Sequence, residues 1–407
     1  PNAGMNRGGR VYITGYGIIT SIGKNAEENL QSLVDQRHGY SDIDFLKTVH
    51  SHDLRCCEVK LADDELRTIA AAKGPSLTRT TLLGLVALRE AINHAGLSAS
   101  DLHRSGLLSS TTTGGIREFE RDFNNIVAVD RRGEFEQFAD TAIPGDHTER
   151  LADLVGIHNY VATLSTACSS SANTIMQGAA LIRSGRLDCV ICGGSEALSK
   201  FTINGFNALM ILDHEHCRPF DATRSGLNLG EGAAYVVLES AARVERLRKT
   251  PLAVLAGAGN ANDAHHITAS SPDGTGALKA MRLALSHAGI DAREVSYVNA
   301  HGTATENNDL SEGTGMKRLF ADHLPPFSST KPYTGHTLAA AGSIEAVYSI
   351  LALHNRMVWP SLNFKNPMAE LAISPATELI KDVPIRHVLS NSFGFGGNTS
   401  SLLLSAV

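Results

Sequence analysis

The stretch AINHAGL at residues 91–97 returns as ALSHAGI at residues 284–290, an offset of 193 positions. Each copy ends an amphipathic helical pattern with a glycine, the residue most often found just after a helix C-terminus. An acidic residue, Asp101 or Glu294, follows each copy and leads into a short apolar segment that predicts a strand. The same order of helix, glycine and strand in two places predicts a duplicated α/β fold.

Later strands correspond as well. Residues 233–238 and 401–404 are apolar runs that each follow a short glycine-containing turn. Helix-glycine-strand order is also common by chance in α/β proteins, and this alternative stays open at the level of sequence. We expect an N-terminal half at residues 5–250 and a C-terminal half at residues 251–407, with loops from both halves around one shared site.

Apolar spacing and flanking glycine or serine predict the main elements. Long helices are expected over residues 77–95, 170–183, 276–287 and 338–355. Strands are expected near residues 11–14, 106–109, 160–164, 188–194 and 295–298. The run DCVICGG at residues 188–194 is typical of a buried parallel strand, whereas the polar stretch 117–149 predicts a surface excursion.

Composition limits the possible functions. The 407 residues are 43% hydrophobic and 19% charged with a net charge of −6, as in folded globular proteins. No block of like charges indicates a nucleic acid or a membrane, although a mildly acidic surface does not exclude an acidic carrier partner. Six irregularly spaced cysteines, no secretory signal and no membrane-spanning apolar run predict reduced thiols in a cytoplasmic protein.

Cys168 is the candidate nucleophile. It lies in the run TACSSSA between a predicted strand and a predicted helix, with small residues on both sides. Free N–H groups and the dipole at a helix start favour a thiolate, and backbone N–H groups at such a turn can bind an oxyanion. The competing interpretation is a buried structural cysteine, which suits Cys189 and Cys192 better because their C-x-x-C pair lies inside an apolar strand.

Two histidines lie on glycine-containing loops. His301 follows a predicted strand in the run NAHGTAT, and His336 ends the run KPYTGH ahead of a small-residue helix. Imidazoles at element ends can donate hydrogen bonds to a thioester oxygen as negative charge develops. A zinc site at residues 214–217, HEHC, is a weaker alternative because no second ligand pair has suitable spacing. We expect no metal.

A glycine-rich run, NSFGFGGN, occupies residues 391–398. Its spacing is not that of a dinucleotide loop and a strand follows it, so it predicts a close backbone turn around a site rather than a nucleotide site. Together these segments make the chain resemble the β-ketoacyl–acyl carrier protein synthases, type II elongating condensing enzymes of the thiolase-like fold. The resemblance covers nearly the whole chain and rests on residues 166–171, 193–196, 218–221, 230–232, 301–303, 331–336 and 393–397.

The resemblance implies a layered αβαβα architecture and a catalytic cycle. Cys168 would take an acyl group from a carrier thioester, and His301 and His336 would hold the malonyl carbonyl while carbon dioxide leaves. The backbone N–H groups of Cys168 and Phe395 would form the oxyanion hole, with Phe395 gating the acyl pocket. The acyltransferase reaction would need no permanently bound cofactor, since phosphopantetheine of acyl carrier protein delivers both substrates.

Supporting roles also follow from the resemblance. Lys331, paired with Glu345, would support the histidines, while Asp309 and Glu312 would order the loop of His301. Thr303 and Thr305 match the pantetheine tunnel.

The chain departs from the family at Thr113, where a bulky residue often closes the acyl pocket. A threonine predicts a longer or more polar pocket and favours a specialised polyketide or polyene pathway over housekeeping fatty-acid synthesis. The expected partners are acyl carrier protein and either a second copy or a chain-length-factor homologue.

Three alternatives remain. A thiolase typically needs a second cysteine near the C-terminus, and the last one here is Cys217. A chain-length-factor-like subunit would lack the nucleophile or the histidines, and a Cys-His hydrolase would need water at the acylated cysteine.

Overall fold

The computed structural model describes residues 9–74, 77–127 and 136–407. The strands are β1 (Val11–Thr20), β2 (Gly106–Ser109), β3 (Tyr160–Thr163), β4 (Cys189–Glu196), β5 (Gly232–Ser240), β6 (Ala253–Asn262), β7 (Tyr297–Asn299), β8 (Phe327–Ser328), β9 (His387–Phe393) and β10 (Asn398–Ser405). They form one mixed sheet in the order β3-β2-β4-β5-β1-β6-β10-β9-β7-β8.

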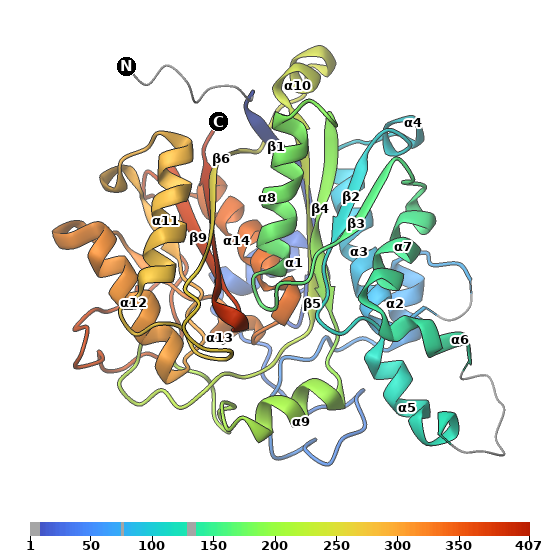
Figure 1. Ribbon diagram of the computed structural model, residues 1–407, viewed down its shortest axis with the longest axis horizontal. Coiled ribbons are helices and arrows are strands. Elements are labelled where there is room, and N and C mark those ends of the chain that lie inside the picture. The colour runs from blue at the N-terminus through green and yellow to red at the C-terminus, as the bar shows by residue number, and fades with distance from the viewer. Residues whose placement is uncertain (1–8, 75–76, 128–135) are drawn as a thin grey trace.

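The α-helices of the described residues surround this sheet (Figure 1). They are α1 (Ala26–Val34), α2 (Asp63–Ile69), α3 (Arg79–His94), α4 (Ala99–Leu102), α5 (Ile116–Ile126), α6 (Glu136–Ala139), α7 (Pro144–Val155), α8 (Ser170–Arg183), α9 (Lys200–Ala208), α10 (Ala241–Leu247), α11 (Thr275–Ala288), α12 (Glu306–Phe320), α13 (Lys331–Thr334) and α14 (Ala341–Asn355). Within the described ranges, none of the helices has the length and apolarity needed to cross a membrane.

The sheet repeats its topology. From one edge inward, the first part of the sheet has the order β3-β2-β4-β5-β1. From the opposite edge inward, the second part has the order β8-β7-β9-β10-β6, so each strand corresponds to the one whose number is smaller by five. The two parts meet where β1 pairs with β6 through Tyr12–Val254 and Ile13–Ala253. The predicted boundary near residue 250, which stays a prediction, lies between α10 and β6.

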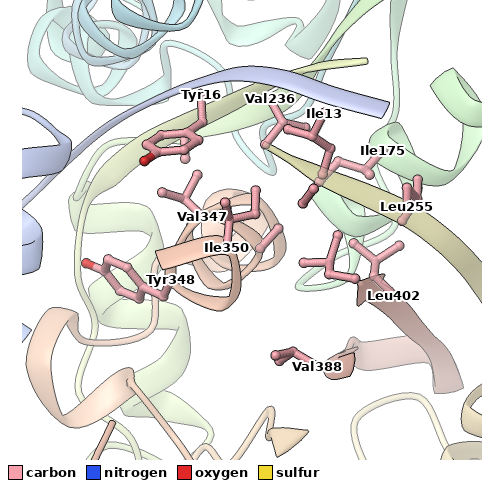
Figure 2. Packing of buried hydrophobic residues seen from close by; sticks show 14 of the residues in the cluster. Ile13, Tyr16, Ile175, Val236, Leu255, Val347, Tyr348, Ile350, Val388 and Leu402 are labelled. Atoms are coloured by element: carbon pink, nitrogen blue, oxygen red, sulfur yellow. The ribbon is translucent and has the colours of Figure 1, made fainter. Parts of the chain in front are cut away.

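Three hydrophobic cores define the layers. The central core joins α8 and α14, through residues such as Ile175 and Val347, to the inner faces of strands from both parts of the sheet (Figure 2). A second core lies under α3, and a third lies under α11 and α12. The molecule is therefore five layers deep, with α8 and α14 in the middle (Figure 1), and the predicted αβαβα architecture is confirmed.

The layers explain the apolar strand sequences. Along β5, alternate residues face two different cores: Ala234, Val236 and Leu238 face the central core, and Ala233, Tyr235 and Val237 face the core under α3. A strand buried on both faces needs a continuous apolar run instead of alternation. The run at residues 188–194 behaves in this way, although β4 is parallel only to β2 and antiparallel to β5.

The predicted helices are present within a few residues of their expected ends, apart from residues 338–340, which form a 3-10 turn before α14. Strand β1 continues six residues beyond the expected Thr14. The predicted surface excursion at residues 117–149 is partly wrong, because α7 buries His147 against α3. Its part at residues 128–135 lies outside the described residues.

Glycines bring helices close to the sheet at equivalent places in the two parts. A Cβ added at Gly17 of β1 would overlap the carbonyl oxygen of Ala87 in α3, and one at Gly259 of β6 would overlap that of Ala280 in α11. Backbone therefore contacts backbone at both places, where any side chain would force the layers apart.

Gly17→Ala is expected to lower the free energy of unfolding by about 1–3 kcal/mol, because the added methyl overpacks the contact between β1 and α3. Gly145→Ala is the control, since a Cβ at that position of α7 meets no atom within 4 Å. Urea unfolding of both variants tests the effect. Equal stability of the two would contradict the close approach.

Candidate active site

Cys168 lies between the end of β3 and the start of α8. Thr166 donates its N–H to Ser170 Oγ at 2.8 Å, and Ser170 Oγ donates to the carbonyl of Ala167 at 2.5 Å, which closes the loop around the cysteine. A Cβ at Gly394 would lie 2.8 Å from the carbonyl oxygen of Thr166 and 3.1 Å from the nitrogen of Cys168. A glycine is therefore needed for the turn after β9 to reach the nucleophile.

Cys168 is buried, with 6% of the residue exposed. Burial raises its pKa to about 12, opposed in part by the Lys331 charge and the backbone N–H of Phe395, whereas the carboxylates of Glu196 and Glu345 raise it further. The sequence predicted a thiolate at the helix start, and this is wrong for the resting protein. Loss of solvation outweighs the groups that favour the anion, so Cys168 rests as a neutral thiol.

His301 lies on the loop between β7 and α12, and a buried carboxylate shapes that loop. Glu312 accepts the N–H of His301 at 2.9 Å and the N–H of Gly302 at 2.8 Å. Asp309 accepts the N–H of Ala304 at 3.2 Å. Two carboxylates one turn apart on α12 therefore fix the backbone that carries the imidazole.

The ammonium group of Lys331 finds three hydrogen-bond acceptors inside the site. Its Nζ donates to the Glu345 carboxylate, to the carbonyl oxygen of His301 at 2.5 Å and to Nδ1 of His301 at 3.2 Å. An ammonium group has three donors and no acceptor, so Nδ1 of His301 accepts and Nε2 carries the proton. The ion pair of Lys331 with Glu345, whose side chains are each 3% exposed, thus selects the histidine tautomer.

His336 faces His301 from the turn between α13 and α14. The two ring centroids are 5.3 Å apart, with the planes at 82°. The backbone of His336 is held on both sides: its N–H donates to Asn228, and its carbonyl accepts from Gly230. Burial lowers the pKa of both imidazoles well below 6.5, and the Lys331 charge adds to the effect. Both rings are therefore neutral hydrogen-bond donors at physiological pH.

One cavity of about 400 Å³ contains the thiol and both imidazoles. Its wall includes Cys168, His301, His336, Thr303, Thr305 and Phe395, which were all singled out from sequence. Phe395 stacks on Phe206 of α9, with ring centroids 5.8 Å apart and planes 17° apart. Among the described residues, no group of three or more His, Cys, Asp or Glu side chains could hold a metal ion.

Thr113 is placed differently from the rest. Its hydroxyl donates to the buried carboxylate of Glu196 at 3.1 Å, and Thr113 is not among the described residues that line the cavity. Sequence reasoning quoted Glu196 in a motif but gave it no role. It also missed Phe206, whose signal is weak because an aromatic on a short amphipathic helix is common.

This fold, with a thiol and two imidazoles on one cavity, is compatible with the class of condensing acyltransferases. Models of the β-ketoacyl synthase N-terminal domain and C-terminal domain match residues 9–244 and 252–365. The chain therefore belongs to the β-ketoacyl synthase family.

Full-length relatives agree with this. The chain is 32% identical over 410 residues to "3-oxoacyl-[acyl-carrier-protein] synthase 2" of Staphylococcus aureus (strain N315), covering 98% of this chain and 99% of the relative. It is 33% identical over 407 residues to "Nodulation protein E" of Rhizobium meliloti (strain 1021), covering 98% and 99%.

Solved structures share the fold over the same length. The ishigamide ketosynthase/chain length factor superimposes with a TM-score of 0.92 at 28% identity, covering 98% of this chain and 100% of that one. A ketosynthase (ApeO) in complex with its chain length factor (ApeC), from Xenorhabdus doucetiae, gives a TM-score of 0.84 at 30% identity and covers 98% of each chain. The predicted thiolase-like fold and the predicted acyltransferase class are both confirmed.

Alkylation of Cys168 by iodoacetamide should still rise steeply above pH 10, because the raised pKa leaves little thiolate below that pH. An ordinary thiol, with a pKa of about 8.5, would reach its plateau earlier. Peptide mass spectrometry separates Cys168 from the five other cysteines. A plateau at or below about pH 10, where a thiol with a pKa of about 8.5 is almost fully ionised, would contradict the raised pKa.

Lys331→Met should lower the free energy of unfolding by about 3–5 kcal/mol, because it leaves the Glu345 carboxylate buried without a partner. The double variant Lys331→Met/Glu345→Leu removes both charges and should lose less stability than the single one. Guanidinium unfolding of the single and double variants measures this difference. An equal or larger loss in the double variant would show that the ion pair is not the dominant contact.

Proposed function

We propose that this β-ketoacyl synthase takes an acyl group from acyl carrier protein onto Cys168 and joins it to malonyl carrier by a decarboxylating Claisen reaction. One observation carries the proposal: a buried neutral thiol and two neutral imidazoles, from different parts of the chain, line a single cavity.

The first step exchanges one thioester for another. The sulfur of Cys168 forms a bond to the acyl carbon, the bond to the carrier sulfur breaks, and the thiol proton ends on the departing carrier thiol. The N–H of Phe395, which favours the anion of Cys168, and the N–H of Cys168 supply the oxyanion donors. Thr303 and Thr305 lie on the cavity wall, and their hydroxyl oxygens are hydrogen-bonded to each other at 2.8 Å. These hydroxyls would contact the pantetheine arm.

The second step needs donors rather than a base. As the malonyl group loses carbon dioxide, its electron pair moves onto the thioester oxygen, and neutral His301 and His336 stabilise that charge. The enolate carbon then attacks the acyl carbonyl on Cys168, and the released sulfur takes up a proton. The reaction as proposed needs no resident cofactor or metal.

A dimer is part of the proposal. The sheet ends at β3, whose residues 160–163 are only half-buried. Beside it, α8 presents half-buried Met176 and exposed Gln177 and Ala180, which carry no charge. An edge strand next to such a face suits pairing with a second copy or a homologous subunit. The ketosynthase–chain length factor structures found among the relatives support a homologous subunit as one such partner.

The pathway is proposed to be a specialised polyketide or polyene one. Thr113 does not support this choice, because its hydroxyl donates to Glu196 and it is not among the described residues that line the cavity. The similarity to type II polyketide ketosynthases, including one bound to its acyl carrier protein, supports this choice.

Cys168→Ala should abolish the acyl-enzyme seen by intact-protein mass spectrometry, since it removes the atom that accepts the acyl group. His301→Ala and His336→Ala should each keep acylation but slow malonyl decarboxylation by about 10²–10³-fold, the usual cost of one oxyanion donor. Release of carbon dioxide from labelled malonyl carrier measures the second step.

His354→Ala is the matched control, because this exposed histidine bonds the carbonyl of Leu252 outside the cavity. It should leave both steps unchanged. Acylated protein in Cys168→Ala, or full decarboxylation in either cavity histidine variant, would refute the mechanism.

A further inference from the structure

Glu196 is a buried carboxylate at the end of β4 that has no ion-pair partner among the described residues. Five groups donate to it: Thr111 Oγ1 at 3.1 Å, Thr112 N at 2.8 Å, Thr112 Oγ1 at 2.8 Å, Thr113 Oγ1 at 3.1 Å and Ala339 N at 3.3 Å. Three consecutive threonine hydroxyls thus converge on one anion, in place of a lysine or arginine. We call Glu196 with Thr111–Thr113 the threonine clamp.

The clamp contacts the turn that follows His336. The backbone of Ala339 is held on both sides, since its N–H donates to Glu196 and its carbonyl accepts from Ser110 Oγ at 3.3 Å. The preceding residue, Leu338, is buried with φ +48°, a conformation that a leucine keeps only where its surroundings impose it. The turn is therefore held in place by groups on β4 and after β2.

The same turn is part of the wall around the nucleophile. Leu338 and Leu198 pack in one apolar cluster with Cys168, and Leu198 follows Glu196 by two residues. The carboxylate is near enough to act on the thiol, because its charge raises the pKa of Cys168. The clamp thus contacts the turn after His336, and its Glu196 is two residues away from Leu198, which packs in the cluster with Cys168.

We propose that Glu196 is a positioning residue for the condensation, and that its carboxylate holds the Ala339 turn, and with it His336, in the geometry needed for malonyl decarboxylation. The inference rests on the proposed function. Glu196 touches no substrate in this account and acts only through the turn. It also fixes the Thr111–Thr113 segment, so that segment and the backbone near His336 share one anchor.

Glu196→Leu removes every acceptor and leaves the N–H groups of Thr112 and Ala339 buried without partners. We expect malonyl decarboxylation to fall by about 100-fold, the scale of a misplacement near 1 Å, while acylation of Cys168 falls by less than about tenfold. Glu196→Gln keeps one acceptor and should lie between Glu196→Leu and the unaltered protein. The measured quantity is the ratio of the two rates.

Glu118→Leu is the matched control. Glu118 is a buried carboxylate that also accepts a backbone N–H, from Arg79 at 2.9 Å, but it does not bond the His336 turn. This variant should lose stability with an unchanged ratio of the two rates. If Glu196→Leu shows the control's unchanged ratio, the carboxylate is only structural and the inference is overturned.

A second pair of variants covers the case in which Glu196→Leu fails to fold. Thr112→Val removes one hydroxyl donor at nearly constant shape, and Thr112→Ser restores it. The ratio should fall in the valine variant and recover in the serine variant, and equal ratios in both would overturn the inference. If the unaltered protein neither acylates nor decarboxylates, the proposed function itself fails, which is a separate outcome.

Discussion

The ammonium group of Lys331 is the interaction on which the active cavity depends. It is buried against Glu345 and donates its remaining hydrogens to His301, so it sets the tautomer of that ring. Burial lowers the pKa of His301, and the Lys331 charge lowers it further, so the ring is neutral. The same positive charge adds to the effect of burial in lowering the pKa of His336, and it partly offsets the rise that burial causes in the pKa of Cys168. Without its partner Glu345, an ammonium group in this position would be too costly to bury.

The layered fold explains how these groups meet. Strand β3 delivers Cys168 to the start of α8, while β7 and α13 deliver the two histidines from the other part of the sheet. The two middle helices, α8 and α14, pack against each other, and Glu345 lies on α14. The ion pair is thus anchored in the buried central layer, and the close packing of a protein interior leaves side chains few alternative positions.

Much of the fold could be predicted from the sequence because local patterns encode it. Helices α3, α8 and α11 have apolar spacing and recognisable ends, and β4 and β5 are apolar runs whose two faces meet different cores. The stretch at residues 117–149 was harder, since α5 and α7 bury only part of their surface and their pattern is diluted by charge. Strand β1 was underestimated because glycines that permit close helix contact also interrupt the apolar signal.

The sequence by itself determined the repeat and the residue types of the site, because periodicity and motif order are local properties, while the layers followed from the resemblance to a known family. Only the tertiary structure decided the protonation of the site. Whether Cys168 is a thiol or a thiolate depends on its solvation and on charges from Lys331, Glu196 and Glu345, which are distant in sequence. The threonine clamp is likewise invisible in sequence, since three threonines become one anion site only when β2 and β4 are neighbours in the sheet.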